Sequence, residues 1–120
     1  MGAFNIIEAP CICPACQAEA VISAQAHVAA SFLGDESGRF SGRTYRLSER
    51  MAWWPEMDAK HGAWPEGGDP SQRPLIREAC YAKCTRCHAA LCAVVEFQDL
   101  AAVRLVQVSL EADWPAGYLR

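Results

Sequence analysis

The sequence lacks long apolar runs and the motifs of the common catalytic sites. Its longest apolar run, Ala89 to Val95, is far shorter than the roughly 20 residues that a membrane-spanning helix needs. There is no H-x-E step of the zinc deaminases, no G-x-S-x-G step of the hydrolases and no phosphate-binding loop. We therefore expect neither a membrane segment nor an enzyme.

Positive charge is scarce, and lysine is nearly missing. The 120 residues carry 11 Lys and Arg against 14 Asp and Glu, a formal net charge of −3, and only Lys60 and Lys83 are lysine. This acidic balance argues against broad, sequence-independent binding to nucleic acids, because such binding is largely electrostatic. Arginine is the better residue for bidentate and stacked contacts, so the arginines are the candidates for specific contacts with a partner.

Export signals and a disulfide framework are also missing. Residues 1–6 lack the basic and apolar blocks of a signal peptide, and Ile6 stands where a myristoylation motif has Ser or Thr. The seven cysteines form an odd set with two C-x-x-C pairs, which does not fit the disulfides of a small secreted protein. We expect a cytoplasmic protein, and its length predicts one domain over residues 1–120.

What the chain does have is two short cysteine pairs that lie far apart in the sequence. Their members are Cys13, Cys16, Cys84 and Cys87. Together they offer four thiolates, the ligand set of a closed tetrahedral zinc site with Zn–S distances of about 2.3 Å. We predict one structural Zn²⁺ at these sulfurs, with an iron centre of similar spacing as the alternative.

The arrangement of strand, cysteine knuckle and strand, used twice, resembles the zinc-ribbon fold group. The residues that carry the resemblance are Cys13, Cys16, Cys84 and Cys87, with Pro14 inside the first knuckle. The resemblance implies that each knuckle caps a β-hairpin and that the metal holds the two caps together. Because the 67 residues between the two pairs are many for a simple ribbon, it also implies an insertion at about residues 34–75.

Three cysteines and one histidine have open roles. Cys11 lies two residues before Cys13 and could replace it as a ligand, although a free thiol beside the site is the simpler interpretation. Cys80 and Cys92 fit small buried apolar side chains. His88 directly follows the last cysteine of the second pair, and adjacency points its side chain away from the metal, which favours a supporting or exposed role over ligation.

Alternation of apolar and polar residues predicts a mainly β fold with an antiparallel sheet and little helix. The even positions from Ala18 to Phe32 are all apolar, which indicates a half-buried strand, although the alanines leave a helix as the alternative. Residues 33–50 are expected to form the second arm of a hairpin with this strand. Further strands are predicted at residues 44–51, 76–83, 91–97 and 103–110.

The insertion is predicted to be rich in loops and to carry one short helix. Pro55 fits the first helical position and Gly62 the end, so the helix is placed at residues 55–61. Residues 62–74 hold three prolines and three glycines and indicate a loop.

Two groups of side chains in the insertion are candidates for contacts with a partner. They are the arginine series Arg39, Arg43, Arg46 and Arg50 and the tryptophan group Trp53, Trp54 and Trp64. The arginine series is either a solvated hairpin edge or a patch that faces an anionic partner. The tryptophan group is either a satellite core or a protein-binding surface.

These patterns favour a small, zinc-stabilised, non-catalytic module that binds a partner protein. Such a module could be an accessory subunit, a regulator or an inhibitor, including one from a mobile element. One alternative is a nucleic-acid-binding zinc ribbon that uses the arginine series together with Arg86. The other is a thiol redox protein that uses its C-x-x-C pairs.

Overall fold

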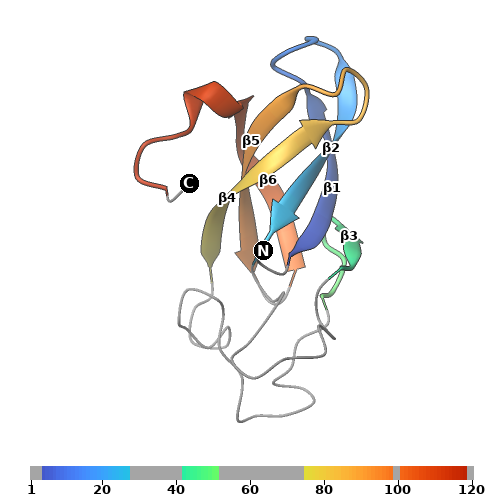
Figure 1. The fold of residues 1–120 in the computed structure, drawn as a ribbon. Coiled ribbons are helices and arrows are strands. Elements are labelled where there is room, and N and C mark those ends of the chain that lie inside the picture. Colours follow the sequence, from blue (N-terminus) through green and yellow to red (C-terminus); the bar gives the residue numbers. More distant parts are fainter. Residues whose placement is uncertain (1–3, 28–41, 52–74, 99–100, 119–120) are drawn as a thin grey trace.

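The structure is a computed structural model that describes residues 4–27, 42–51, 75–98 and 101–118. Its strands are β1 (Asn5–Ile12), β2 (Glu19–Ala26), β3 (Thr44–Arg46), β4 (Ile76–Cys84), β5 (Ala90–Gln98) and β6 (Ala101–Leu110) (Figure 1). The helical content of these ranges is one 3-10 turn, η3 (Glu111–Asp113). The mainly β prediction is confirmed, whereas the helix predicted at residues 55–61 lies outside the described residues. No helix in the described part of the chain is long and apolar enough to cross a bilayer.

The six strands form one sheet in the order β3-β1-β2-β4-β5-β6. Four neighbouring pairs are antiparallel, as predicted, but β3 pairs with β1 in parallel, so the sheet is mixed. For residues 42–50 the predicted hairpin with the strand at 18–32 is therefore wrong, while residues 28–41 of that prediction lie outside the described residues. The first knuckle joins β1 directly to β2, and β4 takes the other edge of β2, so β3 cannot pair with β2 and adds instead to the outer edge of β1.

The sheet curls until its two edges meet. Beyond β3, the amide of Ser48 donates to the carbonyl of Ala102 in β6 at 2.7 Å, and Arg50 bridges Ala101 in antiparallel fashion. Figure 1 shows β3 and the adjoining segment at the side of the sheet formed by β1, close to the start of β6. The inner face of the curl is consequently enclosed by strands on both sides.

The core fills this inner face. Ile7, Ile22, Leu91, Val95 and Phe97 are each at most 1 % exposed. They come from three strands: in β1 and β2 buried and more exposed residues alternate, as in a half-buried strand, whereas β5 is buried from Leu91 to Phe97. On β2 the even positions from Ile22 to Ala26 are buried, which confirms the strand over the helical alternative.

The outer face of β5 is covered as well. Cys92 and Val94 point away from the inner core and yet are 1 % exposed. The segment after β6 lies beside β4 and β5 (Figure 1), and Trp114 in that segment packs on the ring of Tyr81 with 4.9 Å between ring centroids. The outer face thus has one covered part, at β5, and one open part, at β1, β2 and the knuckle end of β4.

Candidate metal centre

Two knuckles of the same backbone geometry lie at the same end of the sheet. In the first, the amide of Gln17 donates to the carbonyl of Cys13 at 2.8 Å, and the amide of Cys13 donates to Ala18 at 3.0 Å. In the second, His88 donates to Cys84 at 2.9 Å, and Cys84 donates to Ala89 at 3.2 Å. Each knuckle joins two neighbouring antiparallel strands, β1 to β2 and β4 to β5, as the resemblance to zinc ribbons implied.

Each knuckle closes through a residue in the left-handed backbone region. Gln17 has φ of 59° and His88 has φ of 64°, and neither is glycine. For an L-residue this conformation costs about 1–2 kcal/mol because Cβ approaches the neighbouring carbonyl oxygen. Both knuckles therefore carry backbone strain immediately after their second cysteine.

The pairing of β2 with β4 brings the two knuckles together. Ile22 pairs with Cys84, and Thr85 binds the carbonyl of Val21 through its amide at 3.1 Å and its hydroxyl at 2.8 Å. As a result the four sulfurs of Cys13, Cys16, Cys84 and Cys87 all lie within 4.8 Å of one another. The sulfurs of Cys13 and Cys87 are 3.8 Å apart. This cluster contains the four cysteines that the sequence predicted as metal ligands.

Backbone amides stabilise negative charge on the sulfurs. Ala15 donates to the sulfur of Cys13 at 3.3 Å, while Arg86 and Cys87 both donate to the sulfur of Cys84 at 3.4 Å. The amide of Cys87, helped by that of Arg86, lowers the pKa of the Cys84 thiol to about 6 despite its burial. The lowered pKa favours the thiolate form of Cys84, which is the form that binds a cation.

The pKa values of two neighbouring thiols, Cys87 and Cys11, are raised instead of lowered. The amide of Ala89 lowers the pKa of Cys87, but burial and hydrogen bonds to the other sulfurs of the cluster together raise it to about 11. The pKa of Cys11 is also raised, by burial and by the charges of Cys13 and Cys84. Because thiolates at this spacing repel one another, the cluster is suited to a cation that all four sulfurs share.

The other predicted site residues have different places. Arg43, Arg46 and Arg50 are exposed on or beside β3, away from the sulfur cluster. Arg39 and the tryptophan group Trp53, Trp54 and Trp64 lie outside the described residues. Among the described residues, the only cluster of three or more metal-ligating side chains is the four-cysteine cluster, so neither Cys11 nor His88 belongs to one.

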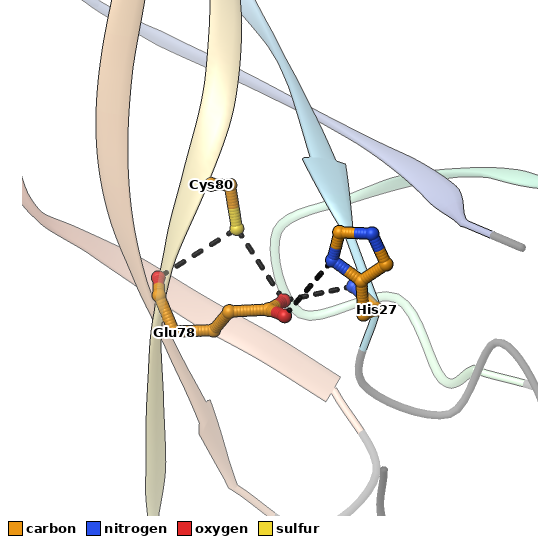
Figure 2. Close-up of polar contacts among 3 residues, drawn as sticks. All are labelled: His27, Glu78 and Cys80. Carbon is orange, nitrogen blue, oxygen red and sulfur yellow. Dashed lines mark hydrogen bonds and ion pairs between the residues drawn. The ribbon is translucent and has the colours of Figure 1, made fainter. Parts of the chain in front are cut away.

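Cys80 and Cys92 are buried, as expected, but Cys80 belongs to a polar group that the sequence analysis missed. The Glu78 carboxylate accepts the amide of His27 at 2.8 Å and lies 3.2 Å from its Nδ1, and the Cys80 sulfur lies 3.5 Å from the same carboxylate (Figure 2). The sequence offers one signal for this group. Glu78 stands at an even position of β4, and the even positions Cys80, Ala82 and Cys84 face the core, so an inward-facing Glu78 needs a polar partner.

A second missed group is a buried carboxylate with two arginines. Glu96 on β5 is 6 % exposed and binds Nε of Arg77 at 3.0 Å and Nε of Arg104 at 3.0 Å, from β4 and β6 respectively. The guanidinium of Arg104, together with that of Arg77, lowers the pKa of Glu96 despite its burial. These ion pairs link the neighbouring strands β4, β5 and β6.

Comparison of the chain with protein-family models, with curated proteins and with solved structures found no match. The likeness to zinc ribbons therefore rests on the cysteine spacing and on the geometry of the two knuckles.

Proposed function

We propose that the four sulfurs hold one structural Zn²⁺ and that the chain is a zinc-stabilised, non-catalytic binding module. The observation that carries this proposal is the approach of four cysteine sulfurs, from two separate hairpins, to within 4.8 Å of one another. Sets of four thiolates suit tetrahedral zinc or iron–sulfur chemistry, and zinc is the usual ion in a closed structural site. Four protein ligands leave no position for a catalytic water or a substrate.

The proposed metal has a clear structural task. The register between β2 and β4 covers only three residue pairs, from Ile22 with Cys84 to Ala24 with Ala82. This short seam is where the β1–β2 hairpin joins the β4–β5 hairpin. Structural zinc contributes an apparent ~10–16 kcal/mol in small metal-dependent domains, so an ion shared by both knuckles would dominate the stability of the seam.

We further propose that the module acts through a partner protein. Ile12 and Val21 are 60 % and 41 % exposed on the open outer face of β1 and β2, and Pro10 lies opposite Val21 in the register. Glu8 and Arg46, which pair across β1 and β3, border a groove of about 490 Å³ beside these apolar side chains. An apolar centre with a charged rim is the usual anatomy of a protein interface.

The first test is capture of a partner by the tagged, metal-loaded chain, with and without nuclease treatment. We expect capture that survives nuclease and that falls more than about fivefold in the Val21→Asp variant, because Val21 lines the groove and a central apolar contact is worth more than about 1 kcal/mol. The matched control is Leu75→Asp, since Leu75 is 46 % exposed and does not line the groove. Trp54→Ala tests the tryptophan group in the same assay, and it should weaken capture without changing metal content.

Two results would contradict this proposal in different ways. Capture that disappears after nuclease treatment would favour the nucleic-acid alternative, which the exposed Arg43, Arg46 and Arg50 support. A metal-free chain that stays folded and forms reversible disulfides between its cysteine pairs would favour thiol redox chemistry.

A further inference from the structure

A groove of about 690 Å³ crosses the outer face of the sheet at the seam between β2 and β4. The side chains that matter for its chemistry are Ser23, Tyr81, Lys83, Thr85, His88 and Glu111. The groove lies beside the second knuckle, because Thr85 and His88 belong to that knuckle. Its volume is within the range of pockets that hold small-molecule ligands, about 300–1,000 Å³.

The floor of the groove is an aromatic platform. Tyr81 points outward from β4, is 38 % exposed and leans on Trp114 with 4.9 Å between ring centroids. Contact with Trp114 holds the tyrosine ring in one place, so that the exposed part of the ring is available for stacking. Ala90, which pairs with Lys83 on the neighbouring strand, adds little bulk beside the platform.

A positively charged side chain, that of Lys83, lines the groove next to the Tyr81 ring. Lys83 follows Tyr81 by two residues on the same face of β4, which places it about 7 Å away along the strand. Lys83 and Arg86, in the second knuckle, are both exposed, and neither forms an ion pair within the described ranges. Arg77 and Arg104, by contrast, are paired with Glu96. Lys83 is the cation that lines the groove, Arg86 lies between the lining residues Thr85 and His88 in the adjoining knuckle, and Glu111 is the single acidic side chain of the lining.

Hydrogen-bonding groups complete the lining. Ser23 pairs with Lys83 across the seam, and His88 is directed by a strained backbone with φ of 64°. Strained residues persist where the surrounding structure fixes them and are concentrated at binding and catalytic sites. The second knuckle therefore presents an imidazole to the groove from a position where glycine would be the relaxed choice.

From this combination we propose that the groove binds a nucleotide unit. The base stacks on Tyr81, the phosphate lies between Lys83 and Arg86, and His88 supplies a hydrogen bond. An aromatic ring beside unpaired cations is the arrangement with which proteins hold single-stranded nucleic acids, because every base offers a face for stacking. The same chemistry fits a free nucleotide or one unit of a single strand. The proposal goes beyond the binding of a partner protein, because this groove shares no lining residue with the groove beside Pro10 and Val21.

The test measures binding of fluorescein-labelled (U)8 and (dT)8 by anisotropy, with AMP as competitor, on chain whose zinc content is measured in the same sample. We expect affinity for the octamers to fall about 7-fold between 50 and 200 mM salt if two phosphate contacts are made. Tyr81→Leu should weaken binding about 5-fold or more through loss of stacking. Lys83→Gln should weaken binding and flatten the salt dependence, whereas Glu111→Gln should strengthen binding because it removes the acidic group.

The two knuckles provide a matched control. His88→Gly and Gln17→Gly relax the same backbone strain, but only His88 lines the groove. We expect weaker binding for His88→Gly and unchanged binding for Gln17→Gly.

Competition by AMP at matching affinity would identify a free nucleotide as the ligand, and binding of octamers alone would identify a single strand. No binding of either probe at 50 mM salt by zinc-loaded chain would overturn the proposal, as would equal binding of a poly-glutamate peptide that Tyr81→Leu leaves unchanged. A chain without zinc would instead contradict the metal site.

Discussion

At the scale of single residues, the left-handed glutamine of the first knuckle gives a stability prediction. Glycine at position 17 removes a backbone strain of about 1–2 kcal/mol. It also raises the conformational entropy of the unfolded chain, which lowers stability by about 0.5–1 kcal/mol. We therefore expect Gln17→Gly to raise the free energy of unfolding by about 0.5–1 kcal/mol, measured by urea titration of the metal-loaded chain. Gln17→Ala keeps the strained φ and should bring no gain; an equal gain in both variants would argue against strain at this position.

Glu96 gives a prediction with a defined pH dependence. Its folded-state pKa is lowered by Arg104 and Arg77, so its stabilisation is present above the unfolded value near 4.5 and is lost as pH falls through the folded value. We expect Glu96→Gln to be less stable than the wild type at pH 7 and this difference to shrink below pH 4.5.

Urea titrations of both proteins at each pH give the difference directly. Because acid also releases thiolate-bound metal from both proteins, only that difference is informative. A constant difference from pH 7 to pH 3 would show that the Glu96 carboxylate is not selectively stabilised in the folded state.

Residue-scale prediction from the sequence succeeded where the spacing was short. The C-x-x-C steps identified all four cysteines of the cluster, because two residues between cysteines fix the distance between their sulfurs. The partners of Glu78 and Glu96 could not be found in this way. His27 is 51 residues from Glu78, and only the alignment of β2 with β4 brings them together.

At the scale of elements, the end of the β2–β4 seam depends on a side chain. Past Ala24 and Ala82 the amide of His27 is bound by the Glu78 carboxylate (Figure 2). We expect Glu78→Ala to lower the free energy of unfolding by about 1–3 kcal/mol, because the partly buried amide of His27 then loses its acceptor.

Glu78→Gln is the matched control, since its amide oxygen can still accept a hydrogen bond from the His27 N–H. Its free energy of unfolding should fall clearly less than that of Glu78→Ala. Hydrogen exchange of the His27 amide reports the same event locally and should accelerate in Glu78→Ala alone. Equal exchange rates in both variants would mean that the carboxylate does not hold the end of the seam.

The order of the elements was only partly predictable. Alternation located β2, β4, β5 and β6, and the knuckles defined two hairpins, because local pattern and a short connection determine both. The parallel addition of β3 to β1 was missed. Three residues of strand carry too little pattern to choose an edge, and the choice is made by contacts with β1 and β6 elsewhere in the sheet.

At the scale of the whole molecule, two devices hold the curled sheet in shape. At one end the sulfur cluster joins the two hairpins, and toward the other the segment after β3 meets β6 through Ser48 and Arg50. The sequence predicted the first device, since ligand spacing is a local property. It did not predict the second, because closure of a sheet depends on its total twist and curvature.

The most direct test of this account is zinc K-edge X-ray absorption on the purified, reduced, full-length chain, together with its metal content. We expect one zinc per chain with four sulfur neighbours at about 2.3 Å and no oxygen or nitrogen neighbour. Cys84→Ser should bind zinc less tightly and show a mixed coordination shell, while Cys92→Ser should keep all four sulfurs. A wild-type shell that contains water or nitrogen, or a folded chain with no metal, would contradict the closed four-cysteine site.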